Sequence, residues 1–317
     1  MTSILSALYG VAVGARNAAY DRKILRQHHL RGPVVSVGNL SVGGTGKTPF
    51  TILLGQLLQD RGILFDVLSR GYGRKTSGVR LVDPDGSPHD FGDEPLLIAR
   101  RLQVKVIIGE SRYQAGIFAE NEYGPHLHIL DDGFQHRDLA RNYDIVLVSA
   151  SDPHDQLLPS GRLREPLSSL GRADAIIVSD DSDKILPVKS PAVWKLRRGI
   201  TLATPPQYPA VFCGIARPER FIAELKESGV VPVGQHFFRD HHCYSASDID
   251  KLLTLKQSSG ATGFITTEKD AINLGGLRSS LEPMCVVAVT MALEDSAGFI
   301  DAMLAAIETR KPIPRVK

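Results

Sequence analysis

The sequence predicts an α/β protein with two α/β domains, the first around a mainly parallel sheet and the second smaller. Two observations carry this prediction. From residue 33 onward, short β-branched runs alternate with segments of helical spacing, the pattern of strands and crossover helices in a parallel sheet. The alternation is interrupted over 181–208, where Pro187, Pro191, Pro205 and Pro206 cluster. The 317 residues suffice for two domains of about 150 residues each.

We therefore expect an N-terminal helix within 1–31, a first α/β domain over 32–180, a connector over 181–208 and a second α/β domain over 209–317. In the first domain, strands are expected at Pro33–Leu40, Leu64–Ser69, Val104–Ile108, His126–Leu130, Asp144–Ser149 and Ala175–Ser179. In the second, strands are expected at Pro209–Cys213, Val231–Phe238, Gly263–Thr266 and Cys285–Thr290, and helices at Pro218–Ser228, Ala246–Gln257 and Ser296–Arg310.

Composition excludes several classes of protein. Apolar residues make up 43% and charged residues 23%, as in ordinary globular proteins and unlike disordered, collagenous or coiled-coil chains. The net charge of +2 provides no overall attraction to nucleic acid. Cys213, Cys243 and Cys285 are scattered, which fits a reducing compartment rather than a disulfide framework. No feature of the sequence requires a protein partner.

Residues 3–26 predict a helix with an apolar stripe. The stripe consists of Leu5, Leu8, Ala12, Ala15 and Ala19, widened by Ile4 and Val11. No stretch reaches the ~18 uninterrupted apolar residues of a membrane span. Because charge follows the apolar run rather than preceding it, a retained helix is favoured over a cleaved signal peptide.

Two interpretations of this helix remain open. In one, the stripe packs on the core of the protein itself. In the other, the helix lies in the interface of an anionic membrane, with Tyr9 and Tyr20 as aromatic anchors. The second is favoured by a local basic excess of Arg16, Arg22, Lys23, Arg26 and Arg31 against the single acid Asp21.

The segment SVGGTGKT over 41–48 predicts a nucleotide site. It matches the Walker A pattern except that Ser41 replaces the first glycine. The loop follows an expected strand and opens an expected helix, where backbone N–H groups and the helix dipole favour a polyphosphate. The binding candidates are Ser41, Gly43, Gly44, Thr45, Gly46, Lys47 and Thr48. Lys47 would bridge the β- and γ-phosphates and Thr48 would hold Mg²⁺, so the first domain is expected to resemble P-loop NTPases.

A P-loop enzyme also needs a carboxylate at the end of a neighbouring strand to anchor its metal. The strand expected at His126–Leu130 ends in Asp131 and Asp132. An ordinary Asp-Asp-Gly turn is the alternative. Beside a P-loop, the metal role is favoured.

A wider set of motifs points to one family. These are VGNL before the phosphate loop, SRGYGR at 69–74, GDEP at 92–95, DDGFQHR at 131–137, LREP at 163–166, FRDHHCY at 238–244 and TTEKDA at 266–271. In this order, behind an apolar N-terminal helix, they closely resemble the tetraacyldisaccharide 4′-kinases of lipid A biosynthesis. The resemblance implies transfer of the γ-phosphoryl group of ATP to the 4′-hydroxyl of a disaccharide 1-phosphate, at the cytoplasmic face of the inner membrane. It also implies a fold of two α/β/α domains with the active site in the cleft between them.

The resemblance also implies roles for single residues. Asp93 would be the catalytic base for the sugar hydroxyl, paired with His241, although His242 is a near-equal alternative from sequence alone. Glu165 would join Asp131 and Asp132 at the metal, and Gln135 and Arg164 would contribute to the nucleotide site. His136 and Arg70 are further candidates, although Arg70 and Tyr72 equally fit a structural turn.

Several alternatives are weighed beside these roles. Without the resemblance, Asp93-Glu94-Pro95 is a helix-start signature. The histidines in 240–243 are adjacent and lack a second metal-binding pair, which disfavours zinc. The role of Lys269 and Asp270 stays open.

Two further function classes compete with the kinase. The first is a membrane-associated P-loop ATPase or GTPase that acts as a switch, which would explain the phosphate loop, Asp131-Asp132 and the N-terminal helix. It would not require Asp93 or the motif around His241, and Thr267-Glu268-Lys269-Asp270 is a poor match to a guanine-binding signature. The second is a small-molecule ligase or kinase without membrane contact.

Overall fold

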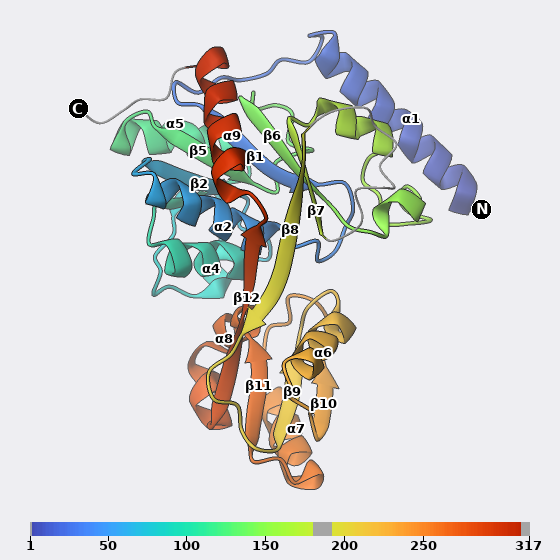
Figure 1. Cartoon of the computed structure of the whole chain (residues 1–317), viewed down its shortest axis with the longest axis vertical. Coiled ribbons are helices and arrows are strands. Elements are labelled where there is room, and N and C mark those ends of the chain that lie inside the picture. Colours follow the sequence, from blue (N-terminus) through green and yellow to red (C-terminus); the bar gives the residue numbers. More distant parts are fainter. Residues whose placement is uncertain (1, 180–191, 312–317) are drawn as a thin grey trace.

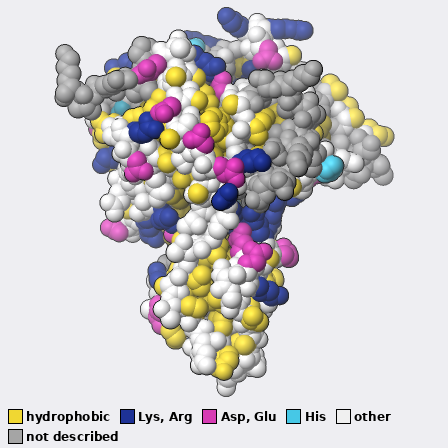
Figure 2. All heavy atoms as spheres, viewed as in Figure 1, with side chains coloured by type: hydrophobic (Ala, Val, Ile, Leu, Met, Phe, Trp, Pro, Cys, Tyr) yellow, Lys and Arg dark blue, Asp and Glu magenta, His cyan; other side chains and the backbone are white. Residues whose placement is uncertain are grey.

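The computed structural model describes residues 2–179 and 192–311. The molecule has two lobes that are connected by two long strands, β8 (Ala192–Thr201) and β12 (Met284–Leu293) (Figure 1). A twelve-stranded sheet runs through both lobes in the order β10-β9-β11-β12-β8-β7-β6-β1-β5-β2-β4-β3. Basic and acidic side chains are interspersed over the face seen in Figure 2.

The strands of the first lobe are β1 (Val34–Asn39), β2 (Phe65–Ser69), β3 (Arg80–Leu81), β4 (Val106–Ile108), β5 (Leu127–Asp131), β6 (Tyr143–Val148) and β7 (Ala175–Ser179). Its helices are α1 (Thr2–Asp21), α2 (Lys47–Asp60), α3 (Pro88–Phe91), α4 (Asp93–Leu102), α5 (Arg112–Tyr123), and the 3-10 helices η1 (Asp152–His154) and η2 (Leu167–Arg172). The second lobe contains β9 (Pro209–Cys213), β10 (Gly234–Phe237), β11 (Gly263–Thr267), α6 (Pro218–Glu227), α7 (Ala246–Ser259), α8 (Glu268–Leu274) and the 3-10 helix η4 (Gly275–Leu281). The last helix is α9 (Ser296–Arg310).

The predicted parallel arrangement is confirmed around the centre of the sheet. β1 pairs in parallel with β5 on one side and with β6 on the other, while β3 and β8 form antiparallel pairs with β4 and β12. Separate apolar clusters cover the two faces of the sheet in each lobe. Because parallel strands end at the same edge, the loops that follow β1, β2 and β5 meet there, where ligands bind in such folds.

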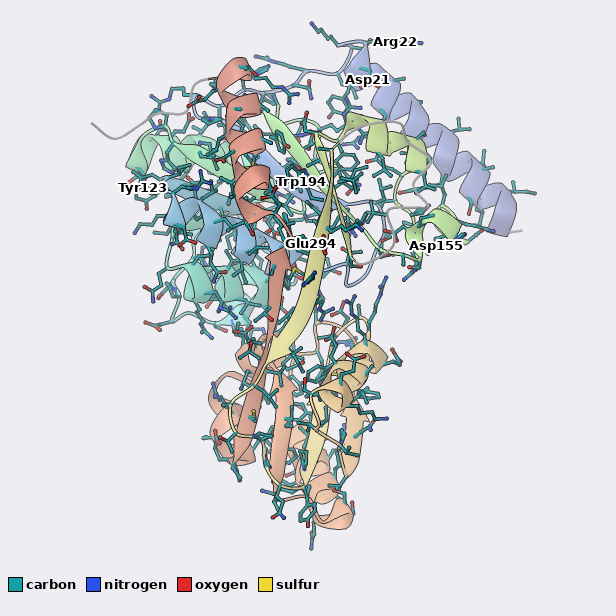
Figure 3. All side chains as sticks on the ribbon, viewed as in Figure 1. Asp21, Arg22, Tyr123, Asp155, Trp194 and Glu294 are labelled. Carbon is teal, nitrogen blue, oxygen red and sulfur yellow. The ribbon has the colours of Figure 1, made fainter. Side chains whose placement is uncertain are left out.

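The structure corrects the expected domain boundaries at two places. Ala192–Thr201 is not an irregular connector but strand β8, which pairs with β7 and β12; 180–191 lies outside the described residues. α9 returns to the first lobe instead of completing the second. Its Phe299 ring lies edge-on to Trp194 of β8 at 5.4 Å and to Phe50 of α2 at 6.3 Å (Trp194 is labelled in Figure 3). The spacing of α9 predicts an apolar face, but it carries no information about which sheet that face covers.

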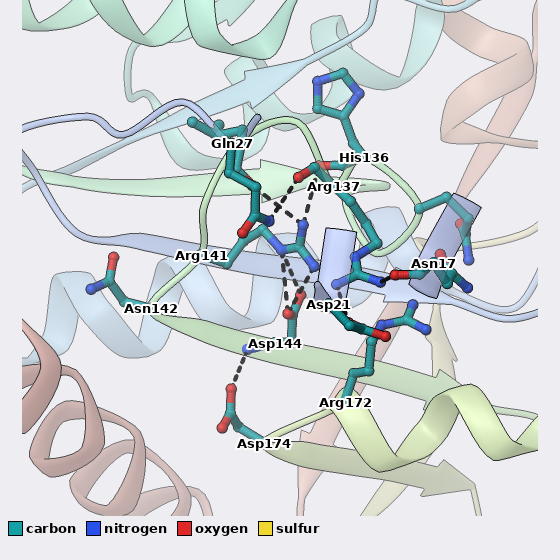
Figure 4. A network of polar contacts seen from close by, with 12 residues as sticks. Asn17, Asp21, Gln27, His136, Arg137, Arg141, Asn142, Asp144, Arg172 and Asp174 are labelled. Atoms are coloured by element: carbon teal, nitrogen blue, oxygen red, sulfur yellow. Dashed lines mark hydrogen bonds and ion pairs between the residues drawn. The ribbon is translucent and has the colours of Figure 1, made fainter. Parts of the chain in front are cut away.

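Helix α1 lies along one side of the first lobe (Figure 1) and docks through polar contacts. Arg137 donates to the carbonyl of Asn17 at 3.1 Å and to Asp21 at 2.7 Å (Figure 4). The apolar stripe instead faces outward: Leu8 is 62% and Val11 71% exposed. The interpretation that the stripe packs on the protein's own core is therefore wrong. Among the described residues, no helix is long and apolar enough to cross a membrane.

Candidate active site

The phosphate loop follows β1 and opens α2, as predicted. Gly43 and Gly46 have φ values of 98° and 90°, a left-handed conformation that glycine adopts without steric cost. Asn39, the last residue of β1, holds the loop: its Nδ2 donates to the Ser41 carbonyl at 2.5 Å and to Thr45 Oγ1 at 2.8 Å. Its Oδ1 accepts from Lys47 Nζ at 3.1 Å. Ser41 is fully buried, and its hydroxyl has no hydrogen-bond partner among the described residues.

The two acids at the end of β5 lie beside this loop and have different environments. Asp132 Oδ1 is 3.5 Å from Lys47 Nζ, and Arg164 Nη1 is 3.1 Å from either oxygen. Burial acts to raise the pKa of Asp132, but the charges of Lys47 and Arg164 outweigh it and lower the pKa. Asp131 accepts hydrogen bonds from hydroxyls, those of Thr51 at 3.2 Å and Ser69 at 3.3 Å.

Burial raises the pKa of Asp131 to about 7, with added repulsion from Glu94 and Asp132. A buried carboxylate of this kind is stabilised by a cation placed between it and its acidic neighbours. The donor set is made of carboxylate and hydroxyl oxygens, the ligands that Mg²⁺ prefers. Asp131, Asp132 and Thr48, which lies one helical turn before Thr51 on α2, therefore fit a magnesium ion.

The other expected nucleotide residues join the same network. Gln135 donates to the carbonyl of Asn39 at 3.0 Å, and Arg164 Nη1 lies 3.4 Å from Gln135 Oε1. His136 pairs instead with Asp138 at 2.7 Å. Arg112, which the sequence did not single out, is 5% exposed. Burial, and then the positive charge of Arg70, lower the pKa of its guanidinium, while Asp132 acts to raise it, so two arginines flank the acids.

Glu165, expected at the metal, has other partners. Its Oε2 accepts from Asn17 of α1 at 2.6 Å and pairs with Arg172 at 2.9 Å. The side chain is 2% exposed. These contacts connect α1 to the loop that carries Arg164, so we expect Glu165 to support the site rather than ligate the ion.

Asp93 begins α4 and lies against the second lobe. His241 Nδ1 is 3.0 and 3.1 Å from its two carboxylate oxygens, and Asn273 Nδ2 donates to Oδ2 at 3.0 Å. The backbone N–H of Glu94 donates to Oδ1 at 2.8 Å. Burial acts to raise the pKa of Asp93, but the hydrogen bond from His241 and the charge of Lys269 outweigh it and lower the pKa. The carboxylate is thus ionised and ready to accept a proton.

The structure distinguishes the two adjacent histidines. His241 has a positive φ of 56° and faces Asp93. His242 Nε2 instead lies 3.1 Å from Asp248 Oδ2, and its ring stacks on that of Phe238 with the centroids 4.4 Å apart. The two imidazoles therefore have separate partners.

Two hollows flank this arrangement. One is lined by Tyr72, Gly73, Pro88, His89, Gly92, Asp93, His241, Cys243 and Asn273. The other lies beside Thr45 at the ends of β6 and β7 and includes Arg198, Arg217 and Arg220. The first contains the acid–histidine pair and the second borders the phosphate loop.

Comparison with known proteins identifies the family. The sequence profile described as tetraacyldisaccharide-1-P 4′-kinase (LpxK) matches residues 1–308. The chain belongs to this family. The tetraacyldisaccharide 4′-kinase of Koribacter versatilis is 51% identical, over 97% of this chain and 99% of the relative. That of Geobacter metallireducens is 37% identical, over 93% and 94%. The crystal structure of LpxK from Aquifex aeolicus in complex with ATP matches with a TM-score of 0.80 and 33% identity, over 96% of this chain and 97% of that one.

Sequence reasoning missed four residues of this 4′-kinase site or gave them no role: Asn39, Arg112, Lys269 and Asn273. Asn39 sits in the VGNL motif at the end of a strand beside the phosphate loop, a position that could have been recognised. Asn273 lies one helical turn after Lys269 on α8, and the helical spacing alone could have grouped these two. Arg112 carries no local signal, because the charges that act on it, those of Arg70, Asp131 and Asp132, come from distant parts of the sequence.

Proposed function

We propose that the protein is a tetraacyldisaccharide 4′-kinase: it transfers the γ-phosphoryl group of ATP to the 4′-hydroxyl of tetraacyldisaccharide 1-phosphate, forming lipid IVA in lipid A biosynthesis. One observation carries this proposal. The Asp93–His241 pair joins the second lobe to the lobe that carries the phosphate loop, with nitrogen–oxygen distances of 3.0 and 3.1 Å. A sugar hydroxyl needs a base of this kind, and family membership supports the same reaction.

The phosphate end of ATP is assigned to the loop over 41–48, with Lys47 on the phosphates. Gln135 and Arg164 are assigned to the same site through their contacts with Asn39 and Asp132. The hollow beside Thr45 would take the nucleoside. Mg²⁺, held by Thr48, Asp131 and Asp132, would neutralise charge on the transferring phosphoryl group.

The hollow beside Asp93 is assigned to the sugar acceptor. In the reaction, Asp93 takes the proton of the 4′-hydroxyl while the oxygen attacks the γ-phosphorus and the bond to ADP breaks. Tyr72 lies at the rim of this hollow, 63% exposed, with its ring 5.1 Å from that of His241. It therefore offers an aromatic surface on which a sugar ring can pack.

We also propose that the outward face of α1 lies in the surface of an anionic membrane, on the cytoplasmic side of the inner membrane. Ile4, Leu5, Leu8 and Val11 are all more than half exposed, and the basic residues 16–31 follow on the same segment. Apolar side chains with basic neighbours are the features of an interfacial helix. A small-molecule enzyme without membrane contact would have no use for this face.

The nucleotide switch is the competing function, and family membership disfavours it. The kinase and the switch differ in the acceptor of the γ-phosphoryl group, which is the lipid for the kinase and water for the switch. Purified protein is incubated with γ-labelled ATP, Mg²⁺ and tetraacyldisaccharide 1-phosphate in mixed micelles, beside Lys47→Ala, Asp93→Asn and the matched neighbour variant His242→Gln. We expect label in the lipid, lost in Lys47→Ala and Asp93→Asn and retained in His242→Gln. Label in free phosphate alone, unchanged in Asp93→Asn, would instead support the switch.

A further inference from the structure

Arg217 of the second lobe lies beside the phosphate loop of the first lobe, and the proposed function gives it no role. It is the last residue before α6, in the segment 214–217 that follows β9. The preceding residue, Ala216, lies against the loop: a Cβ added to Gly44 would be 3.6 Å from that of Ala216. Arg217 and Thr45 line the same hollow. The segment after β9 therefore places a guanidinium group beside the loop that would hold the phosphates of ATP.

The segment 214–217 is held in place by the buried carboxylate of Asp270 on α8. Asp270 Oδ1 accepts from the backbone N–H of Gly214 at 2.8 Å and from the Tyr244 hydroxyl at 2.8 Å. Its other oxygen accepts from the Thr267 hydroxyl at 2.6 Å. All these partners belong to the second lobe, so that lobe itself fixes the segment that carries the guanidinium group.

Two other arginines line this hollow, and both have a carboxylate partner. Arg198 Nη2 is 3.2 Å from Glu224 Oε2, and Arg220 Nε is 3.0 Å from the other oxygen of the same carboxylate. Arg217 forms no ion pair with any residue that the structure describes, and its buried Nη2 has no hydrogen-bond partner there. Of the three guanidinium groups at the hollow, that of Arg217 is therefore the one whose charge is unpaired within the described part of the chain.

The surroundings of Arg217 leave its positive charge poorly compensated. Burial, and then the nearby charge of Arg162, lower the pKa of the Arg217 guanidinium, while Asp152 acts to raise it. Asp152 is fully buried, and its Oδ2 already accepts from the backbone N–H of Ser149 at 2.9 Å. An anion bound beside Arg217 would offset the repulsion between the two guanidinium groups and provide an acceptor for Nη2.

The neighbouring residues indicate that this anion is a phosphate of the nucleotide. The planar fork of an arginine matches the oxygens of a phosphate group. Lys47 and Arg164 lie beside Asp132, where the proposed function places the γ-phosphoryl group. Arg217 lies instead with Thr45 at the hollow assigned to the nucleoside. Because the α- and β-phosphates connect the nucleoside to the γ-phosphoryl group, they are the phosphates nearest to Arg217 in this assignment.

We propose that Arg217 binds the α- and β-phosphates of ATP and of ADP from the second lobe, across the nucleotide from the phosphate loop. Arg198 and Arg220 are held by Glu224 and shape the hollow around this contact. The inference deepens the proposed function and rests on it only in taking the ligand to be an adenine nucleotide. The bond that breaks lies beyond these two phosphates, so Arg217 contributes to binding before the reaction as much as during it.

The binding test measures the affinity of the full chain for ATP, ADP and adenosine by competition with a fluorescent ATP analogue. We expect Arg217→Gln to raise the Kd of ATP and that of ADP by the same factor, about 10- to 100-fold, as for the loss of a hydrogen bond to a charged group. The Kd of adenosine should not change. Arg217→Lys keeps the charge without the planar fork and should give intermediate Kd values for both nucleotides.

The matched control is Arg197→Gln. Arg197 adjoins Arg198 on β8, but its side chain is 77% exposed and pairs with Glu294 at 3.3 Å. Its variant removes the same charge from the neighbouring position of the strand and should leave all three Kd values in place.

The kinetic test uses the same variants. Because the contact is made equally before and during phosphoryl transfer, Arg217→Gln should raise the KM for ATP much more than it lowers kcat. The Kd of ATP should also depend less steeply on salt concentration in Arg217→Gln than in the wild type, because a contact between opposite charges is lost.

A loss of affinity confined to ATP would overturn the proposal, because it would place Arg217 at the γ-phosphate. An equal loss for adenosine would also overturn it, as would unchanged Kd values for both nucleotides. If Arg217→Gln does not fold, the same three Kd values of Arg217→Lys decide the question. If the wild type transfers no phosphate to the disaccharide, the proposed function fails, while the binding of ADP and adenosine still decides the role of Arg217.

Discussion

Asn17 of α1 donates a 2.6 Å hydrogen bond to Glu165, whose side chain also pairs with Arg172 and is 2% exposed. This contact connects the helix with the outward apolar face to the segment that carries Arg164, a neighbour of Asp132. A buried charge therefore helps to attach the N-terminal helix to the nucleotide site.

Removing the charge of Glu165 tests whether this residue is structural or a metal ligand. Breaking a buried ion pair costs about 3–5 kcal/mol, so Glu165→Gln should lower the free energy of unfolding measured in urea. The Mg²⁺ concentration for half-maximal activity should stay the same. Asn17→Ala, which removes a donor but leaves Arg172, is the milder control. A strong increase in the Mg²⁺ requirement without loss of stability would instead indicate that Glu165 is a metal ligand.

Asn39 should be required for nucleotide binding. Its side chain accepts from Lys47 and donates to the Ser41 carbonyl and to Thr45, so Asn39→Ala leaves the lysine without this acceptor and the loop without two hydrogen bonds. We expect the KM for ATP to increase by about 100-fold, because three hydrogen bonds at roughly 1 kcal/mol each are lost. Asn39→Asp keeps the acceptor for Lys47 but not the donors, and should have an intermediate KM. Equal KM values for all three proteins would contradict this role.

How much of this site the sequence could predict depends on the range of the contacts. The phosphate loop, Asp131 and Asp132 follow strands that are visible as local patterns, and the structure brings them together as expected. Whether His241 or His242 faces Asp93 depends on a positive φ at His241 and on α4, which no local pattern encodes. The motif around Glu165 likewise does not predict the hydrogen bond with Asn17, because that residue lies far away in the sequence.

Helix α9 illustrates the same limit for the fold, and its packing can be tested. Phe299 is fully buried against Trp194 and Phe50. Phe299→Ala should therefore cost about 3–5 kcal/mol in urea unfolding, although it lies in the segment expected to belong to the second lobe. Leu253→Ala on the exposed face of α7, 41% exposed, is the control and should change stability by less than about 0.5 kcal/mol.

A buried ion network at the opposite edge of the sheet predicts how stability depends on pH. His128 of β5 lies 2.8 Å from Asp66 and 3.5 Å from Glu120. Burial acts to lower the pKa of His128, but Asp66 and then Glu120 outweigh it and raise the pKa to about 9. Burial acts to raise the pKa of Glu120, but hydrogen bonds from His128, Gly32 and Arg31 lower it to about 2.

The contribution of His128 to the free energy of unfolding is fully present below the unfolded-state histidine pKa of about 6.5. It is lost as the pH rises through the folded-state pKa of about 9. The contribution of Glu120 to the free energy of unfolding is fully present above the unfolded-state glutamate pKa of about 4.3. It is lost as the pH falls through the folded-state pKa of about 2. Unfolding free energy should thus be greatest between about 4.3 and 6.5 and fall by about 3 kcal/mol by pH 9. His128→Gln should abolish the alkaline decrease, and His126→Gln, at the partly exposed end of the network, should retain it.

The outward face of α1 should determine membrane binding without determining chemistry. Leu8 and Val11 are 62% and 71% exposed, so replacing both with aspartate removes apolar area and adds negative charge where no buried contact is lost. In sedimentation with vesicles containing anionic lipid, Leu8→Asp/Val11→Asp should bind at least about 10-fold more weakly, since charged residues are costly in the interface. Leu8→Ser/Val11→Ser is the matched control, because it removes the apolar area without adding negative charge. Activity on detergent-dispersed substrate should remain, because Asn17, Tyr9 and Arg16 still hold α1 to the segments of Glu165, Arg164 and Gln135. Unchanged vesicle binding by the aspartate variant would show that another surface contacts the membrane.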